Sequence, residues 1–134
     1  MIAPWAGEYV GIPFVEHGRT RKGCDCFGLY RLALGEKFGK WLPEWKDGYD
    51  DFKDSGNLAL LINTGIALID AKPVEKPIVG DIVQVKYFGD GQHIGMYVGE
   101  GMMLHSSRLQ KYSCIEPLSD PKIRSRVAGY FRIP

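Results

Sequence analysis

Three side chains of this sequence are of the types that cooperate in nucleophilic catalysis. Cys26 closes the motif Cys24-Asp25-Cys26 directly before an apolar run, and His93 and His105 follow in the second half of the chain. Unpaired N–H groups and the positive end of the dipole at a helix start favour a thiolate over a thiol. A thiolate that attacks an amide also needs a proton shuttle, which is most often a histidine. The sequence therefore indicates Cys26 as a nucleophile that works with a histidine.

Other chemistries fit the spacing of the cysteines less well. Paired zinc ligands are usually separated by two to four residues and redox cysteines by two, whereas a single residue separates Cys24 from Cys26. A free cysteine is most often buried and unreactive, and this is the interpretation we keep for Cys24 and Cys114. We expect no metal ion and no cofactor. Because the three cysteines are odd in number, at least one thiol is expected to be free.

The two histidines of the second half lie on segments with the pattern of neighbouring strands. His93 opens the segment HIGMYVG and His105 ends the segment GMMLH, with a Gly-Glu-Gly turn between them. A hairpin would bring the two residues together, so that one ring can orient the other. His17 lies in the polar loop VEHGRTRKG, where a solvated side chain is expected. From spacing alone, a structural role for His93 and His105 stays as open as a catalytic one.

The elements that must position these residues can be predicted from periodicity. Apolar residues recur at helical spacing from Asp25 to Phe38, with Asp25 as the N-cap and Gly39 as the stop. A second helix is predicted over residues 55–63. After Gly80, β-branched and aromatic residues alternate, which predicts antiparallel strands at about residues 82–88, 93–98, 102–106 and 112–116 and at GYFRI. Helices followed by strands indicate an α+β fold.

Length and composition limit the class of protein. The chain has 134 residues, of which 45% are hydrophobic, so we expect one globular domain spanning residues 1–134. A net charge of +1 with both signs scattered along the chain argues against a nucleic-acid partner. We also expect no signal peptide and no membrane span, because the start of the chain lacks a long apolar region and no window is apolar enough.

Several blocks together resemble one known family. The segment GCDCFGLYRL, followed far downstream by GDIVQV and then QHIGMYVGEGMMLHSS, is similar to the NlpC/P60 cysteine peptidases. Within that family the resemblance is to the variants found in bacteriophage and prophage tail modules. It runs from YVGIPF to VAGYFRI, and the order and spacing of the blocks are more specific than any one of them.

The resemblance implies a papain-like α+β fold, in which a helix that carries the nucleophile packs against an antiparallel sheet that carries the histidines. By motif, Cys26 matches the nucleophile, His93 the base that takes its proton, and His105 the residue that orients the base. Backbone N–H groups at the helix start would hold the oxyanion. The family acts on bacterial cell-wall peptides, typically at the bond between D-γ-glutamate and a diamino acid.

Four further residues are expected to bind substrate by the same resemblance. Phe27 stands where many members have serine and resembles the tryptophan of the phage-tail variants, at the substrate rim. Phe14 stands where members often have a tyrosine, so the hydroxyl is missing, and Tyr9 is a possible substitute. Asp25 matches an aspartate that binds a substrate amino group in some relatives, although a helix N-cap explains it equally well.

The resemblance also suggests how the protein reaches its substrate. We expect synthesis in the bacterial cytoplasm and delivery to the cell wall within a phage tail, with other tail proteins as partners. Two alternatives remain open at this stage. One is a structural tail component without activity, and the other is an amidase or acyltransferase with the same three catalytic residues, because fold and triad do not determine which bond is cut.

Overall fold

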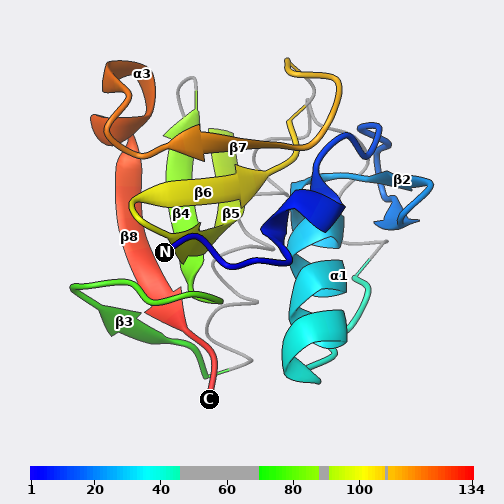
Figure 1. The fold of residues 1–134 in the computed structure, drawn as a ribbon, viewed down its shortest axis with the longest axis horizontal. Helices are drawn as coiled ribbons and strands as arrows, with labels where there is room; N and C mark the ends of the chain where they lie inside the picture. The colour runs from blue at the N-terminus through cyan, green and yellow to red at the C-terminus, as the bar shows by residue number, and fades with distance from the viewer. Residues whose placement is uncertain (46–69, 88–90, 108) are drawn as a thin grey trace.

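The computed structural model of the protein describes residues 1–45, 70–87, 91–107 and 109–134. In this part of the chain a six-stranded antiparallel sheet lies beside the helix α1 (Cys26–Phe38), as Figure 1 shows. In spatial order the strands are β3 (Lys72–Val74), β8 (Val127–Arg132), β4 (Ile82–Tyr87), β5 (Gly91–Gly99), β6 (Met102–His105) and β7 (Cys114–Pro117). The predicted α+β fold is confirmed.

Smaller elements surround the start of α1. The 3-10 helix η1 (Ala6–Tyr9) precedes a short antiparallel pair formed by β1 (Arg19–Thr20) and β2 (Gly23–Cys24). A one-turn helix, α3 (Pro121–Arg124), lies between β7 and β8 along the chain. None of these was predicted. The predicted helix over residues 55–63 lies outside the described residues.

The helix α1 begins and ends where the sequence indicates. Asp25 is the N-cap, and its Oδ1 accepts a hydrogen bond of 2.8 Å from the backbone N–H of Gly28. Gly39 ends the helix in the left-handed region, at φ 68°, which glycine adopts without steric cost. The side chains of Leu29, Leu32 and Ala33, which carry the predicted periodicity, are buried.

The alternation of side chains along the strands builds a core on each face of the sheet. The face toward α1 is apolar and contributes Ile82, Ile94, Met96, Val98 and Leu104 to the core that includes the helix. The opposite face carries Val83, Val85 and Met103, which pack with Leu118 and Ile123. The tight β5–β6 turn places Gly99, Glu100 and Gly101 at positive φ, and the two glycines adopt this conformation readily.

Two segments of the sheet differ from the prediction. No strand was predicted at residues 71–77, but β3 within them pairs with β8 at the edge of the sheet. An edge strand tolerates Pro73, which has no N–H to donate. The strand expected at residues 112–116 begins instead at Cys114, because Tyr112 makes an isolated bridge with Pro13.

The carboxylate of Asp25 joins the start of α1 to the loop before it. Besides capping Gly28, it accepts hydrogen bonds from the backbone N–H of His17 at 3.1 Å and from Nη1 of Arg19 at 2.9 Å. The side chains of Arg19 and Asp25 are both almost fully buried. A Cβ atom at Gly28 would overlap the carbonyl oxygen of Gly18, so glycine is required for this close approach. No helix in the described part of the chain has the length and apolarity to cross a membrane.

We expect the change Asp25→Ala to lower the free energy of unfolding by roughly 3 kcal/mol, because it removes the carboxylate of a buried ion pair and a helix cap together. The measurement is urea unfolding followed by circular dichroism. Asp120→Ala is the matched control, since Asp120 caps the short helix α3 at the surface and its loss should cost about 1 kcal/mol. Equal losses for the two variants would contradict this role of the Asp25 carboxylate.

Candidate active site

The predicted nucleophile Cys26 is the first residue of α1 and lies against strand β5. Its side chain is buried, and the backbone groups of Ile94 and Phe27 make hydrogen bonds that favour its ionised form. Ile94 directly follows His93 along β5. The structure therefore brings the thiol to the part of β5 that carries the predicted base.

The two predicted histidines contact each other. His93 Nε2 and His105 Nδ1 are 2.8 Å apart, and the ring planes are nearly perpendicular, at 79°. In the β5–β6 pairing, Met96 lies opposite Leu104 and Tyr97 opposite Met103, so the alternation places both histidines on one face as diagonal neighbours. The predicted hairpin therefore brings the two rings into contact, and the role of one ring in orienting the other stays a prediction.

A second contact holds the histidine strands against the segment that leads into α1. The hydroxyl of Ser106, the residue after His105, donates a hydrogen bond of 3.1 Å to the carbonyl oxygen of Cys24. Both residues are fully buried. Cys24 is thus tied to Ser106, which follows His105. Cys26 is tied to Ile94, which follows His93. These two links between distant parts of the chain keep the three predicted catalytic residues in one place.

The second ring nitrogen of His105 faces two residues that sequence reasoning missed. His105 Nε2 lies 3.5 Å from a carboxylate oxygen of Glu116 and 3.6 Å from the sulfur of Cys114. The thiol of Cys114 in turn donates to the same Glu116 oxygen at 3.4 Å. Cys114 was expected to be buried and inert, as Cys24 is, but it is only half-buried and contacts the histidine pair. The signal that could have found these residues is the β6–β7 register, in which His105 lies opposite Cys114.

The negative charge of Glu116 near His105 favours one arrangement of the protons on the two rings. A carboxylate only accepts, so the carboxylate near Nε2 of His105 favours a proton on that nitrogen. Nδ1 of His105 is then an acceptor, and His93 Nε2 is the donor between the two rings. Nδ1 of His93 is then the nitrogen of that ring that carries no proton. The contacts that lead from His93 through His105 thus end at the carboxylate of Glu116.

Burial determines the resting protonation state of the site. It raises the pKa of the Cys26 thiol to about 12, against the opposing effect of the Ile94 and Phe27 backbone groups. Burial, and secondarily the neighbouring His105, lowers the pKa of His93 well below its ordinary value. Both shifts favour the uncharged form of each group, a thiol at Cys26 and a neutral imidazole at His93. This differs from the thiolate expected from the helix start alone, because desolvation outweighs the helix dipole.

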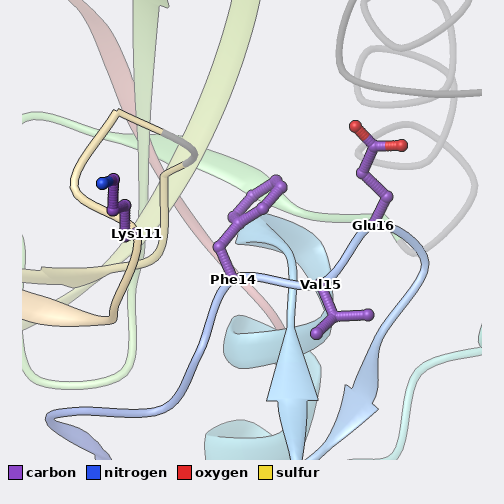
Figure 2. A pocket seen from close by; sticks show the side chains of 4 residues that line it. All are labelled: Phe14, Val15, Glu16 and Lys111. Carbon is purple, nitrogen blue, oxygen red and sulfur yellow. The ribbon is translucent and has the colours of Figure 1, made fainter.

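The expected substrate-binding residues have very different positions. Phe14 makes a bridge with Cys24 and lines a cavity of about 440 Å³ together with Val15, Glu16 and Lys111, as Figure 2 shows. Glu16 and Lys111 lie on opposite sides of the Phe14 ring in that view. An aromatic residue at position 14 therefore borders an open space beside the segment that carries the nucleophile.

Tyr9 and Phe27 are turned into the protein. The hydroxyl of Tyr9 donates to the carboxylate of Glu36 at 2.6 Å. Glu36 lies ten residues after Cys26 in α1, which is about 15 Å along the helix axis. This position argues against Tyr9 as a substitute for the missing tyrosine hydroxyl. The ring of Phe27 stacks on Trp45 with centroids 5.3 Å apart and is almost fully buried, so it packs in the core and does not form a substrate rim.

Asp25 is placed as the helix cap. Its two carboxylate oxygens accept hydrogen bonds from Gly28, Arg19 and His17, so the cap interpretation has direct geometric support. A contact with a substrate amino group stays a prediction. His17, expected to be a solvated loop residue, is half-buried, and its backbone joins the Asp25 network.

Comparison with known proteins identifies the family. A model described as the NlpC/P60 family matches residues 11–132. The chain belongs to the NlpC/P60 family. The resemblance noted from the motifs is therefore confirmed over nearly the whole chain, while no comparison supports an association with phage tails.

Relatives within the NlpC/P60 family include named hydrolases of two bacilli. The gamma-DL-glutamyl hydrolase of Bacillus subtilis strain 168 is 29% identical over 133 residues, which cover 95% of this chain and 27% of that protein. The gamma-D-glutamyl-L-lysine dipeptidyl-peptidase of Bacillus cereus is 27% identical, over 90% of this chain and 32% of that protein. The chain thus spans about a third or less of the length of these relatives.

A solved NlpC/P60 structure shows the same fold. The crystal structure of an NlpC/P60 family protein from Bacillus cereus superposes with a TM-score of 0.65 at 26% identity. The match covers 96% of this chain and 38% of that one. The papain-like arrangement, with Cys26 at the start of a helix packed on the antiparallel sheet, is therefore the arrangement of the family.

We expect native Cys26 to react slowly with iodoacetamide at neutral pH and about tenfold faster for each pH unit into the alkaline range, because only the thiolate reacts. A pKa raised in the folded state keeps the thiol protonated at every pH below it, so reactivity must increase with pH. The measurement is mass-spectrometric location of the label, with unfolded protein as the control. Fast labelling that is constant between about pH 5 and pH 8 would show a resting ion pair instead.

Proposed function

We propose that this chain is a cysteine peptidase domain that hydrolyses stem peptides of peptidoglycan, at the bond between D-γ-glutamate and a diamino acid. The observation that carries the proposal is the placement of Cys26 at a helix start against β5, beside a buried His93–His105 pair. Membership of the NlpC/P60 family supports peptidoglycan as the substrate class.

The resting neutral pair supports a mechanism in which proton transfer accompanies attack. His93 Nδ1 takes the thiol proton as the Cys26 sulfur attacks the peptide carbonyl. The resulting imidazolium donates through Nε2 to His105, whose own N–H faces the negative carboxylate of Glu116. His93 then protonates the leaving amine, and water hydrolyses the thioester with His93 again as the base. Glu116 stabilises the positive charge that His105 alone, as a neutral ring, would stabilise less well.

The start of α1 is suited to hold the oxyanion of the tetrahedral intermediate. Backbone N–H groups in the first turn of a helix point away from the helix and have no partner within it. Asp25 occupies the N–H of Gly28 and the thiol of Cys26 contacts the backbone of Phe27, which leaves the N–H of Cys26 itself as the candidate. No side-chain hydroxyl from position 14 is needed for this role, which fits the presence of phenylalanine there.

The surroundings of Phe14 support a peptide substrate with charges of both signs. Glu16 and Lys111 lie on either side of the aromatic ring at the cavity beside Cys24, so a peptide that carries an amino group and a carboxylate could contact both (Figure 2). The two bacillus relatives are both named for a γ-glutamyl bond. These two observations together favour the D-γ-glutamyl bond over other amide bonds.

Delivery within a phage tail is a further part of the proposal. Its support is the aromatic residue at position 27, which resembles the tryptophan of the phage-tail variants. The cytoplasm as the place of synthesis, and other tail proteins as partners, are proposed on the same resemblance.

The test of the proposed function is digestion of purified peptidoglycan with fragment identification by mass spectrometry. We expect cleavage after D-γ-glutamate by the wild type and a loss of rate of at least about 10³-fold in Cys26→Ala, because no other group replaces the nucleophile. Cys24→Ala is the matched control, with a buried thiol two residues away, and should remain active. No cleavage by the wild type would favour the structural alternative, and release of whole stem peptides would favour an amidase.

A second prediction concerns Glu116. We expect Glu116→Gln to lower kcat about 10- to 100-fold with KM preserved, because an amide can donate to Nε2 of His105 and reverse the tautomers of both rings. The measurement is the steady-state rate on a γ-D-glutamyl peptide. The control is Glu75→Gln, which changes an exposed glutamate directly after β3 and should behave as the wild type. An unchanged kcat in Glu116→Gln would show that the carboxylate does not orient the histidine pair.

A further inference from the structure

The residues His105, Cys114 and Glu116 form a cluster that the peptidase mechanism does not fully use. They lie on one face of the adjacent strands β6 and β7, where His105 is opposite Cys114 and Glu116 is two residues further along. The three facing atoms are an imidazole nitrogen, a thiol sulfur and a carboxylate oxygen. Each of them can ligate a metal ion.

The distances between these atoms match the edges of a tetrahedral zinc site. Zinc bonds of about 2.3 Å to sulfur and about 2.0–2.2 Å to nitrogen or oxygen place neighbouring ligand atoms about 3.3–3.6 Å apart at a tetrahedral angle. The observed separations are 3.6 Å from sulfur to nitrogen, 3.5 Å from nitrogen to oxygen and 3.4 Å from sulfur to oxygen. An ion can therefore reach all three atoms without any movement of the backbone.

The same distances are too long for well-formed hydrogen bonds to His105. An N–H···O hydrogen bond usually spans about 2.7–3.2 Å, whereas His105 Nε2 and Glu116 are 3.5 Å apart. By contrast, the opposite nitrogen of the same ring makes a contact of 2.8 Å with His93. The spacing around Nε2 therefore fits three ligands around an ion better than it fits a hydrogen-bonded group.

The kind of donor atoms and their exposure indicate which ion would bind. A thiolate and an imidazole favour zinc and similar transition-metal ions, whereas magnesium and calcium favour sites made of oxygen alone. His105 is buried, but Cys114 and Glu116 are half-buried, so an ion can enter from solvent and keep a water as its fourth ligand. Gln110 Nε2 donates to Glu116 at 2.8 Å and His93 contacts the far nitrogen of His105, so two of the three ligands have supporting partners.

We propose that His105, Cys114 and Glu116 bind a zinc-class divalent ion and that the bound ion switches off the histidine pair. On binding, Cys114 releases its thiol proton to solvent and Nε2 of His105 becomes a ligand. The proton of neutral His105 must then reside on Nδ1, from which it donates to Nε2 of His93. The proton of neutral His93 moves to Nδ1, so this ring can no longer accept the proton of Cys26. The switch depends on the proposed peptidase function, but the binding of the ion does not.

Binding is tested with metal-free protein titrated with Co²⁺ and with Zn²⁺. We expect one ion per chain and, with Co²⁺, a thiolate-to-metal charge-transfer band that Zn²⁺ removes. Cys114→Ser should lose the band, whereas Cys24→Ser and Cys26→Ser, each lacking a thiol outside the cluster, should keep it. Glu116→Gln should weaken binding at least about tenfold. Circular dichroism checks that each variant is folded, and the Glu116 variant decides the question if Cys114→Ser does not fold.

Two results would overturn the site. One is the absence of the charge-transfer band in the wild type, and the other is a band that disappears in Cys26→Ser but persists in Cys114→Ser, which would place the ion at the nucleophile. The switch is tested by the rate of each protein with Zn²⁺ relative to its own rate with a chelator. Zn²⁺ should inhibit the wild type and Cys24→Ser but not Cys114→Ser.

The outcomes separate the two proposals. If Zn²⁺ binds at the cluster and the wild-type rate does not change, the switch is wrong and the site stands. If no protein hydrolyses peptidoglycan under any condition, the proposed function fails, and the cobalt spectra still decide whether the cluster binds an ion.

Discussion

The carboxylate of Asp25 accepts hydrogen bonds from Gly28, from the backbone of His17 and from the buried guanidinium of Arg19, and the geometry of the site depends on these contacts. They join the first turn of α1 to the loop before it. Because Cys26 directly follows Asp25, the same contacts set the direction from which the thiol approaches β5. Ser106 then connects β6 to the carbonyl of Cys24. The predicted catalytic residues therefore come from three elements that are held together by buried polar contacts.

Burial of these contacts has an electrostatic consequence. A site that excludes water destabilises the charged form of each group, so the pKa of Cys26 rises while that of His93 falls. The two pKa values shift in opposite directions, but each shift favours the uncharged form of its group. In such a site charge develops mainly during the reaction, where the helix start and Glu116 can stabilise it. This gives the fixed dipoles of the protein a larger effect on the transition state than on the resting state.

His105 connects two kinds of chemistry through its two nitrogens. Nδ1 faces the base His93, and Nε2 faces the thiol of Cys114 and the carboxylate of Glu116. A neutral imidazole carries one proton, so whatever occupies Nε2 determines whether Nδ1 donates or accepts. A carboxylate at Nε2 and a metal ion at Nε2 therefore have opposite effects on His93. The half-buried thiol of Cys114 thus lies within contact distance of the ring that touches His93.

Local signals in the sequence were sufficient for the helix α1 and the central strands β4, β5 and β6. The cap at Asp25, the stop at Gly39 and the alternation along β4, β5 and β6 are short-range patterns, and the order and spacing of the blocks around Cys26, His93 and His105 carried the resemblance to the NlpC/P60 family. Only the tertiary structure decided the rest. Cys114 and Glu116 reach His105 through the register of β6 and β7, which a loop of unpredictable path separates in sequence. The orientation of Tyr9 toward Glu36, the burial of Phe27 and the neutral state of Cys26 likewise depend on what surrounds each side chain, because desolvation and packing are set by residues distant in sequence.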